Sequence, residues 1–227
     1  MCFTPTISLT TTIIEFAIAT FILTFYRKSL VNRFFVILIY VLGAYQFTEF
    51  MLCVSNNPIL WARLGFIVYT FLPAIAIYYI LLYSKKINNK QYFKLVYLIP
   101  IFFSVIAFYF GSFISRAECS QFFVIGQNML YSISPILSAF YGLYYYGAII
   151  LSAIFILKKA FNEKNKIKKY IAINIFLALM VSLVPALILI IILPAISIMF
   201  PSIYCEFAIL FSIAALIAAR LDNQLKK

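Results

Sequence analysis

The stretch FFVILIYVLGAYQFTEFMLC, residues 34–53, decides the fold. It carries a single acidic or basic side chain, Glu49. Its length matches the roughly 20 apolar residues that a helix needs to cross a bilayer. Apolar residues run continuously through it, whereas a strand of a membrane barrel would alternate apolar and polar positions. The stretch therefore predicts a membrane-spanning helix.

Near the end of this helix Gln46, Glu49 and Cys53 follow the spacing i, i+3, i+7. Residues at these intervals lie on one helical face, one above the other. Polar side chains within a membrane helix usually face the interior of a helix bundle, because lipid cannot satisfy them. We therefore expect this face to point inward.

The composition of the whole chain extends this interpretation. The chain has 227 residues, of which 66% are hydrophobic and 11% charged, and its mean hydropathy is +1.07. A soluble domain carries about 25% charged residues. Only 6 glycines and 8 prolines interrupt the apolar runs, which favours helices over a barrel. The sequence predicts a single all-α domain, residues 1–227, that crosses the cell membrane several times.

We predict seven transmembrane helices. The last two run together without an intervening charge, and Pro194 and Pro201 are the expected place for a break between them. The predicted spans are residues 7–26, 34–53, 60–83, 92–113, 134–157, 170–193 and 200–219.

Basic residues are distributed very unequally between the two sides. All except Arg63 and Arg116 fall in or beside the first, third and fifth inter-span loops, or in the C-terminal tail. By the positive-inside rule the N-terminus lies outside and the C-terminus is cytoplasmic. This placement accounts for the net charge of +12 and makes the lipid bilayer, not nucleic acid, the expected partner.

Ionisable residues inside the spans are the candidate ligand-binding residues. Glu15 is expected near the middle of the first span, and Glu49, Arg63 and Glu206 within about 10 Å of the outer surface. With Gln46 they predict an outward-facing polar pocket that has Glu15 deeper inside. Alternatively, Glu49 pairs with Arg63 across the short second loop and Glu206 reaches water. Glu15 is expected to be protonated or hydrogen-bonded, which makes it a candidate for the pocket or for a proton relay.

All four cysteines, Cys2, Cys53, Cys119 and Cys205, are expected on the outer, oxidising side. They allow disulfides in three connectivities. A soft-metal site is an alternative, and Cys53 and Cys205 acting as small buried apolar residues is another. We predict no specific metal site.

The sequence contains no histidine, which excludes several kinds of catalytic and metal site. This absence excludes Ser-His-Asp catalysis, HExxH zinc sites and most haem ligation. Neither a GxGxxG motif nor a P-loop is present, so the sequence leaves any cofactor unidentified and favours a function other than an enzyme's. Tyr144, Tyr145 and Tyr146 are expected to be packing residues.

Three short motifs resemble a family of seven-span prokaryotic membrane proteins that has no assigned activity. The chain reads MCFT at 1–4, QFTE at 46–49 and YCEFA at 204–208. Members of the family open with Met-Cys-Phe-Ser, carry Gln-Phe-Ser-Glu in the second span and have Trp-Cys-Phe-Phe-Ala in the seventh.

The resemblance implies that Cys2, Gln46, Glu49 and Cys205 belong to one constellation on the outer side. Glu206 stands where the family has an aromatic residue, so the resemblance gives Glu206 no shared role.

The stretch LWARLGFIVYTFLPAIAIYYILLY, residues 60–83, is similar to the third span of the seven-span sensor region of some bacterial histidine kinases, with an early Trp-x-Arg and a mid-helix proline. In those proteins the last span leads into a cytoplasmic signalling domain. Because this chain ends at Lys227, the resemblance implies that a signal would pass to a separate cytoplasmic signalling protein.

From these features we expect a sensor-like or receptor-like membrane protein that binds a small-molecule ligand from outside. One alternative is a small transporter or proton-coupled permease that uses Glu15 and Glu49 as the relay. Another is a thiol-dependent membrane enzyme or metal handler that uses Cys2 and Cys205.

Overall fold

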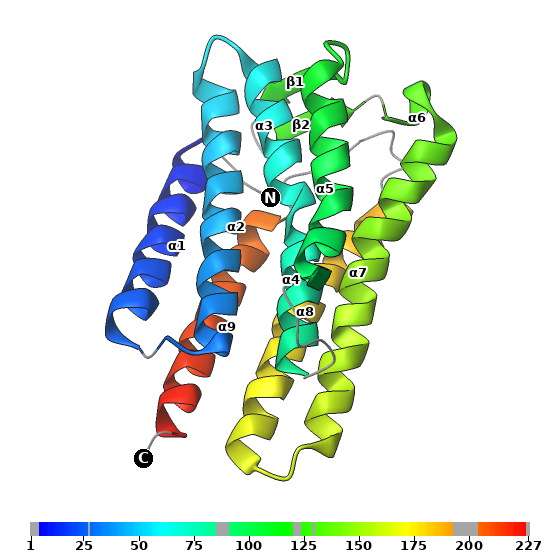
Figure 1. Cartoon of the computed structure of the whole chain (residues 1–227). Helices are drawn as coiled ribbons and strands as arrows, with labels where there is room; N and C mark the ends of the chain where they lie inside the picture. Colours follow the sequence, from blue (N-terminus) through cyan, green and yellow to red (C-terminus); the bar gives the residue numbers. More distant parts are fainter. Residues whose placement is uncertain are drawn as a thin grey trace.

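The structure is a computed structural model that describes residues 5–26, 28–84, 91–119, 124–128, 130–192 and 204–225. Most of these residues are helical, and one small antiparallel sheet is present among them (Figure 1). In chain order the elements are α1 Pro5–Phe25, α2 Leu30–Val54, α3 Pro58–Thr70, α4 Leu72–Tyr83, α5 Gln91–Tyr109, β1 Ile114–Cys119, β2 Val124–Asn128, α6 Leu130–Ile133, α7 Pro135–Asn162, α8 Lys166–Ile192 and α9 Tyr204–Gln224.

Polar side chains just before the helices fix where several of them begin. The side-chain oxygens of Ser29, Asn57 and Ser134 each accept a hydrogen bond from the backbone N–H three residues later, at 3.1, 3.2 and 3.4 Å. Asn165 does the same at the start of α8, at 3.2 Å. Such caps satisfy backbone donors that the first turn of a helix leaves unpaired.

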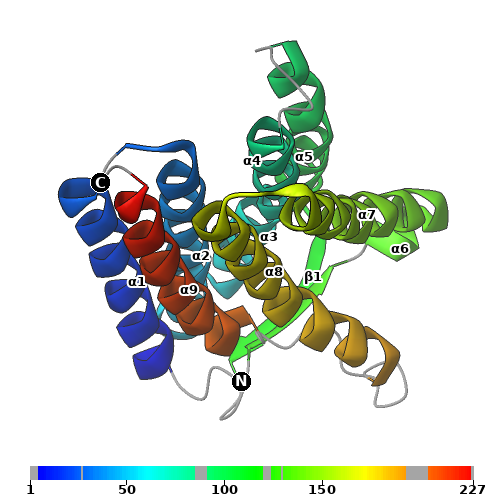
Figure 2. The ribbon, with the colours of Figure 1, turned by 90° about the horizontal axis from the view of Figure 1, so that it is seen from below.

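The longer helices pack into a closed ring. α2 contacts α4, α4 contacts α7, and α8 connects α7 with α9, which returns to α2. α1 covers the outside of α2 and α9, and α5 lies on α3 and α4 (Figure 2). The ring places the first and the last described helices side by side, because α1 and α9 are neighbours.

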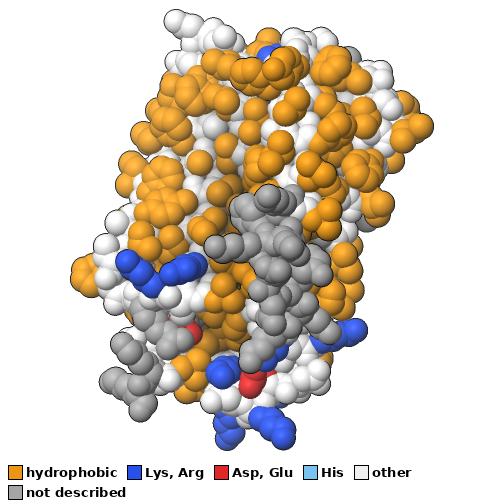
Figure 3. Space-filling view, viewed as in Figure 1, with side chains coloured by type: hydrophobic (Ala, Val, Ile, Leu, Met, Phe, Trp, Pro, Cys, Tyr) orange, Lys and Arg blue, Asp and Glu red, His pale blue; other side chains and the backbone are white. Residues whose placement is uncertain are grey.

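The bundle has two distinct ends. One contains the β1–β2 hairpin and the turn between α2 and α3, and we call it the hairpin end (Figure 1). The other contains the links from α1 to α2 and from α7 to α8, together with the C-terminal end of α9, and we call it the basic end. Lysine and arginine side chains gather at the basic end in Figure 3.

Among the described residues, four helical segments are long and apolar enough to cross a membrane: α1, α2, the continuous pair α3–α4 and α7. Each coincides with a predicted span. Helices α5, α8 and α9 overlap the three other predicted spans in chain order. The predicted break at Pro194 and Pro201 lies outside the described residues.

Large apolar side chains cover the outer surface between the two ends (Figure 3). Ile136 and Leu143 are 80% and 72% exposed, and many other large apolar residues of the long helices are also exposed. A water-soluble protein rarely exposes continuous apolar surface of this extent. With the length of the helices, this surface identifies a membrane protein.

The chain bends between α3 and α4. Phe71 is a turn residue, and Pro73 in the first turn of α4 has no backbone N–H to continue the ladder of hydrogen bonds. Thr70 ends α3, and its carbonyl accepts a hydrogen bond from the hydroxyl of Tyr144 at 2.8 Å. A side chain on α7 thus satisfies backbone at the bend.

The strands β1 and β2 pair in antiparallel orientation and form the hairpin. The buried residues of β1 are Ile114 and Ala117, three positions apart, because the register shifts between Ile114 and Arg116. A shifted register hides the alternation of period two that identifies a strand in a sequence.

Candidate functional site

The buried face of α1 is polar in its first half and apolar in its second. Ser8, Thr12 and Glu15 are buried toward the hairpin end, whereas Ala19 and Ile22 are buried toward the basic end. This face packs against α2 and α9. Thr12 Oγ1 lies 2.8 Å from the Ser8 carbonyl oxygen and 3.4 Å from that of Gly43 on α2. Hydroxyl groups thus bring the two helices together where the interior is polar.

Glu15 is the deepest of these polar residues, and none of its surface is exposed. In the described part of the chain, neither oxygen of its carboxyl group has a hydrogen-bond partner. Gly43 allows α1 to approach closely, since a Cβ at this position would lie only 3.3 Å from Glu15 Oε2. A buried carboxyl group without partners costs several kcal/mol in a membrane interior, which makes Glu15 the strongest candidate for contact with a ligand.

Gln46 and Glu49 continue the polar interior on α2. Gln46 is completely buried and Glu49 is 4% exposed, as expected for a face that points into the bundle. Because α2 runs toward the hairpin end, Gln46 lies about one turn, about 4.5 Å, closer to that end than Gly43. We call Ser8, Thr12, Glu15, Gln46 and Glu49 the polar interface.

Arg63 contacts the backbone that follows α5. Its Nη2 donates a hydrogen bond of 2.6 Å to the carbonyl oxygen of Gly111, which follows α5. The ion pairs between described residues include Arg116–Glu118 and Lys159–Glu163, and the alternative that pairs Glu49 with Arg63 stays a prediction. The structure therefore uses Arg63 to connect α3 with the end of α5.

Three of the predicted site residues cannot be placed beside the polar interface. Cys2 lies outside the described residues. Cys205 and Glu206 belong to the first turn of α9, whose side chains are not described there. The constellation of Cys2 and Cys205 with Gln46 and Glu49, implied by the family resemblance, stays a prediction.

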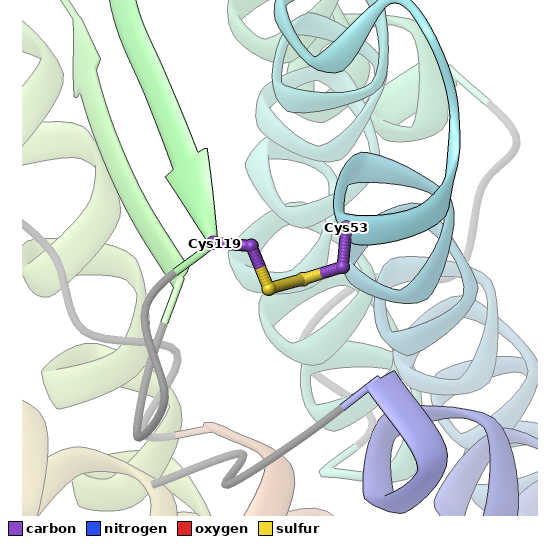
Figure 4. The surroundings of a disulfide bond; sticks show 2 residues. All are labelled: Cys53 and Cys119. Atoms are coloured by element: carbon purple, nitrogen blue, oxygen red, sulfur yellow. A yellow bond between two sulfur atoms is a disulfide. The ribbon is translucent and has the colours of Figure 1, made fainter.

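A disulfide joins Cys53, at the end of α2, to Cys119, at the end of β1 (Figure 4). Their Cα atoms are 5.2 Å apart, and 66 positions separate them in the sequence. Cys53, which shares a helical face with Gln46 and Glu49, thus anchors the hairpin to the bundle. In this oxidised form neither of these two sulfurs is available as a nucleophile or a metal ligand.

The hairpin is also held by packing. Phe113, Ile114 and Ala117 are buried against Leu52 of α2 and Phe66 of α3. The hairpin thus covers part of the hairpin end near the second half of α2.

An exposed ion pair lies on β1. Arg116 Nε is 2.7 Å from Glu118 Oε1. The hydrogen bond from the Arg116 guanidinium keeps the pKa of Glu118 below its ordinary value. These charges face solvent, so they mark the surface of the hairpin.

The sequence did not reveal a hydrogen-bonded group at the bend between α3 and α4. Thr70 Oγ1 lies 2.9 Å from the hydroxyl of Tyr141, and Tyr144 donates to the Thr70 carbonyl. Tyr144 and Tyr145 are buried, in agreement with their predicted packing role, but Tyr144 also satisfies backbone. Pro73 was the available signal, because a proline within a helix frees a carbonyl for another donor.

Within the described residues, no three Cys, Asp or Glu side chains gather as a set of metal ligands. Comparison with known proteins adds no assignment, because no protein-family model, no curated protein and no solved structure matches this chain.

Proposed function

We propose that the chain is a seven-span protein of the cell membrane with its hairpin end outside and its C-terminus in the cytoplasm. The apolar surface of the bundle and the four long apolar helices support membrane crossing. The gathering of lysine and arginine at the basic end supports the orientation, because positively charged loops are retained on the cytoplasmic side.

Reporter fusions at the C-terminus test this orientation. A fluorescent protein that matures only in the cytoplasm is expected to fluoresce there, and alkaline phosphatase, which is active only outside, is expected to be inactive. The opposite pair of results would reverse the proposed orientation, and activity of neither fusion would indicate that the chain is not inserted.

We further propose that the protein is sensor-like and binds a small ligand at the polar interface from the hairpin end. The observation that carries this proposal is Glu15, whose carboxyl group is fully buried without a hydrogen-bond partner among the described residues. A ligand with a cationic group or several N–H donors would satisfy it. Gln46 and Glu49 lie about one and two turns closer to the hairpin end than Gly43, which faces Glu15, and they supply further polar contacts.

A panel of small cations provides the test: alkylammonium, guanidinium and polyamine compounds. Binding to the detergent-purified protein is measured by calorimetry and by the shift of thermal unfolding. We expect at least one class of compound to bind saturably, and Glu15→Gln to weaken that binding at least tenfold, because an ion pair becomes a neutral hydrogen bond. The matched control, Glu118→Gln, removes an exposed carboxylate and should leave binding unchanged.

The same compounds distinguish the sensor from the transporter. Loaded into liposomes that contain the protein, a sensor ligand is retained, whereas a transported cation leaves at a rate proportional to the amount of protein. Equal binding by wild type and Glu15→Gln would refute the role of Glu15, and flux that Glu15→Gln abolishes would favour the permease.

A further inference from the structure

A concave site lies at the basic end, away from the polar interface. The start of α2, the end of α4 and the link between α7 and α8 enclose a groove of about 430 Å³. Its lining residues are Leu30, Leu82, Tyr83, Lys159, Glu163 and Lys168. The groove therefore combines an apolar wall with a charged rim.

The charged rim carries a net positive charge. Lys159 Nζ lies 2.8 Å from Glu163 Oε2, in a pair that is largely covered by its neighbours. The hydrogen bond from Lys159, with a smaller contribution from Lys168, keeps the pKa of Glu163 below its ordinary value. Glu163 is therefore ionised and holds one of the three N–H donors of Lys159, which leaves two donors of Lys159 and all those of the exposed Lys168 for an anion.

The groove also lies at the level where lipid headgroups are expected. Phe161 on α7 and Tyr170 on α8, which flank the link between these helices, are 74% and 60% exposed. Exposed aromatic residues beside lysines are typical of the boundary between the hydrocarbon and the headgroups. Leu30 and Leu82 form the apolar wall of the groove itself.

We propose that this groove binds the phosphate headgroup of an anionic membrane lipid. Lys159 and Lys168 contact the phosphate, while Leu30 and Leu82 contact the apolar part of the lipid next to it. Charge complementarity favours this occupant, and the apolar wall favours a lipid over a small soluble phosphate, which has nothing to place against leucine.

Native mass spectrometry of the delipidated full-length protein tests the proposal with dioleoyl phosphatidic acid and dioleoyl phosphatidylcholine at equal concentrations. The double variant Lys159→Gln/Lys168→Gln is compared with Lys164→Gln/Lys166→Gln, which removes the same charge from the same region outside the groove. Each lysine near an anionic headgroup contributes about fivefold in affinity, so we expect about 25-fold weaker phosphatidic acid binding for the first variant. The control variant should differ from wild type by less than about twofold.

Equal losses in the two double variants would show diffuse attraction and would overturn the site, as would equal binding of both lipids by the wild type. Glycerol phosphate is added as a competitor. Displacement of the lipid at equal concentration would identify a soluble phosphate as the occupant and refute the lipid. If the double variant unfolds, Lys168→Gln alone replaces it, because this side chain is exposed, and about fivefold weaker binding is then expected.

Discussion

Replacement of Gly43 by alanine tests the close approach of α1 and α2 on which the polar interface depends. A Cβ at this position would lie 2.7 Å from Cε1 of Phe16 and 3.3 Å from Oε2 of Glu15. Carbon atoms do not approach to 2.7 Å, so the ring must move, although it packs against Tyr40 with ring centroids 5.7 Å apart. Overpacking of this kind costs about 1–3 kcal/mol.

The matched control is Gly142→Ala on α7, where a new Cβ meets no described atom within 4 Å. Alanine is better than glycine in a helix by about 1 kcal/mol, and this gain applies to both variants. The control should therefore be stabilised by about 1 kcal/mol, whereas the clash offsets or exceeds the gain at Gly43. We expect the control to be more stable than Gly43→Ala by about 1–3 kcal/mol.

Unfolding in detergent by increasing fractions of sodium dodecyl sulfate, followed by the fluorescence of the single tryptophan, Trp61, gives the two free energies of unfolding. Gly65→Ala provides a second test, since its Cβ would lie 2.8 Å from Oγ1 of Thr48, and it should resemble Gly43→Ala. Equal stability of Gly43→Ala and Gly142→Ala would refute the close contact of α1 with α2, and with it the depth at which Glu15 is buried.

Three further predictions concern other parts of the chain. Cys53→Ser/Cys119→Ser should lower the free energy of unfolding by about 2–4 kcal/mol, because the disulfide closes a loop of 66 residues in the unfolded chain. Unfolding in sodium dodecyl sulfate measures this loss, and an unchanged value would refute the constraint. Tyr144→Phe removes the hydrogen bond to the carbonyl of Thr70 and should lower the free energy of unfolding by about 0.6–1.7 kcal/mol in the same assay. No loss would show that this carbonyl has another hydrogen-bond donor. The pKa of Glu163 is lowered in the folded protein, so its stabilising effect is present above its unfolded pKa of about 4.3 and is lost as the pH falls through the lower folded value. Glu163→Gln should therefore reduce the loss of stability between pH 7 and pH 3, measured as the free energy of unfolding. An unchanged dependence on pH would contradict this prediction.

The helices could be predicted from the sequence because the information that defines them is local. A run such as residues 34–53 contains its own length and hydropathy, and Ser29 precedes the observed start of α2 as a capping residue. The inward face of Gln46 and Glu49 also follows from local spacing, and both residues are buried. Neighbouring residues suffice for each of these predictions.

The contacts between helices could not be predicted in the same way. Arg63 is 48 positions from Gly111, and Thr70 is 71 positions from Tyr141, so no local pattern relates the partners. Arg63 has a predicted acidic neighbour one helix away, Glu49, but a backbone carbonyl is an equally suitable acceptor, and the sequence carries no sign of which carbonyl is near.

The distribution of polar residues along the bundle favours a binding function over permeation. Transport requires a polar path that opens to each side in turn. Toward the hairpin end the interior contains Glu15 and Gln46. Toward the basic end Ile22, Phe35 and Ile39 are completely buried, and Asn32 and Asp222 are buried near the ends of their helices. Opening a path there would expose three large apolar side chains, at about 1.5–3 kcal/mol each. A ligand that enters the proposed site from the hairpin end would meet the carboxyl group of Glu15 before the buried side chains of Ile22, Phe35 and Ile39, which is the arrangement expected of a site that holds its ligand.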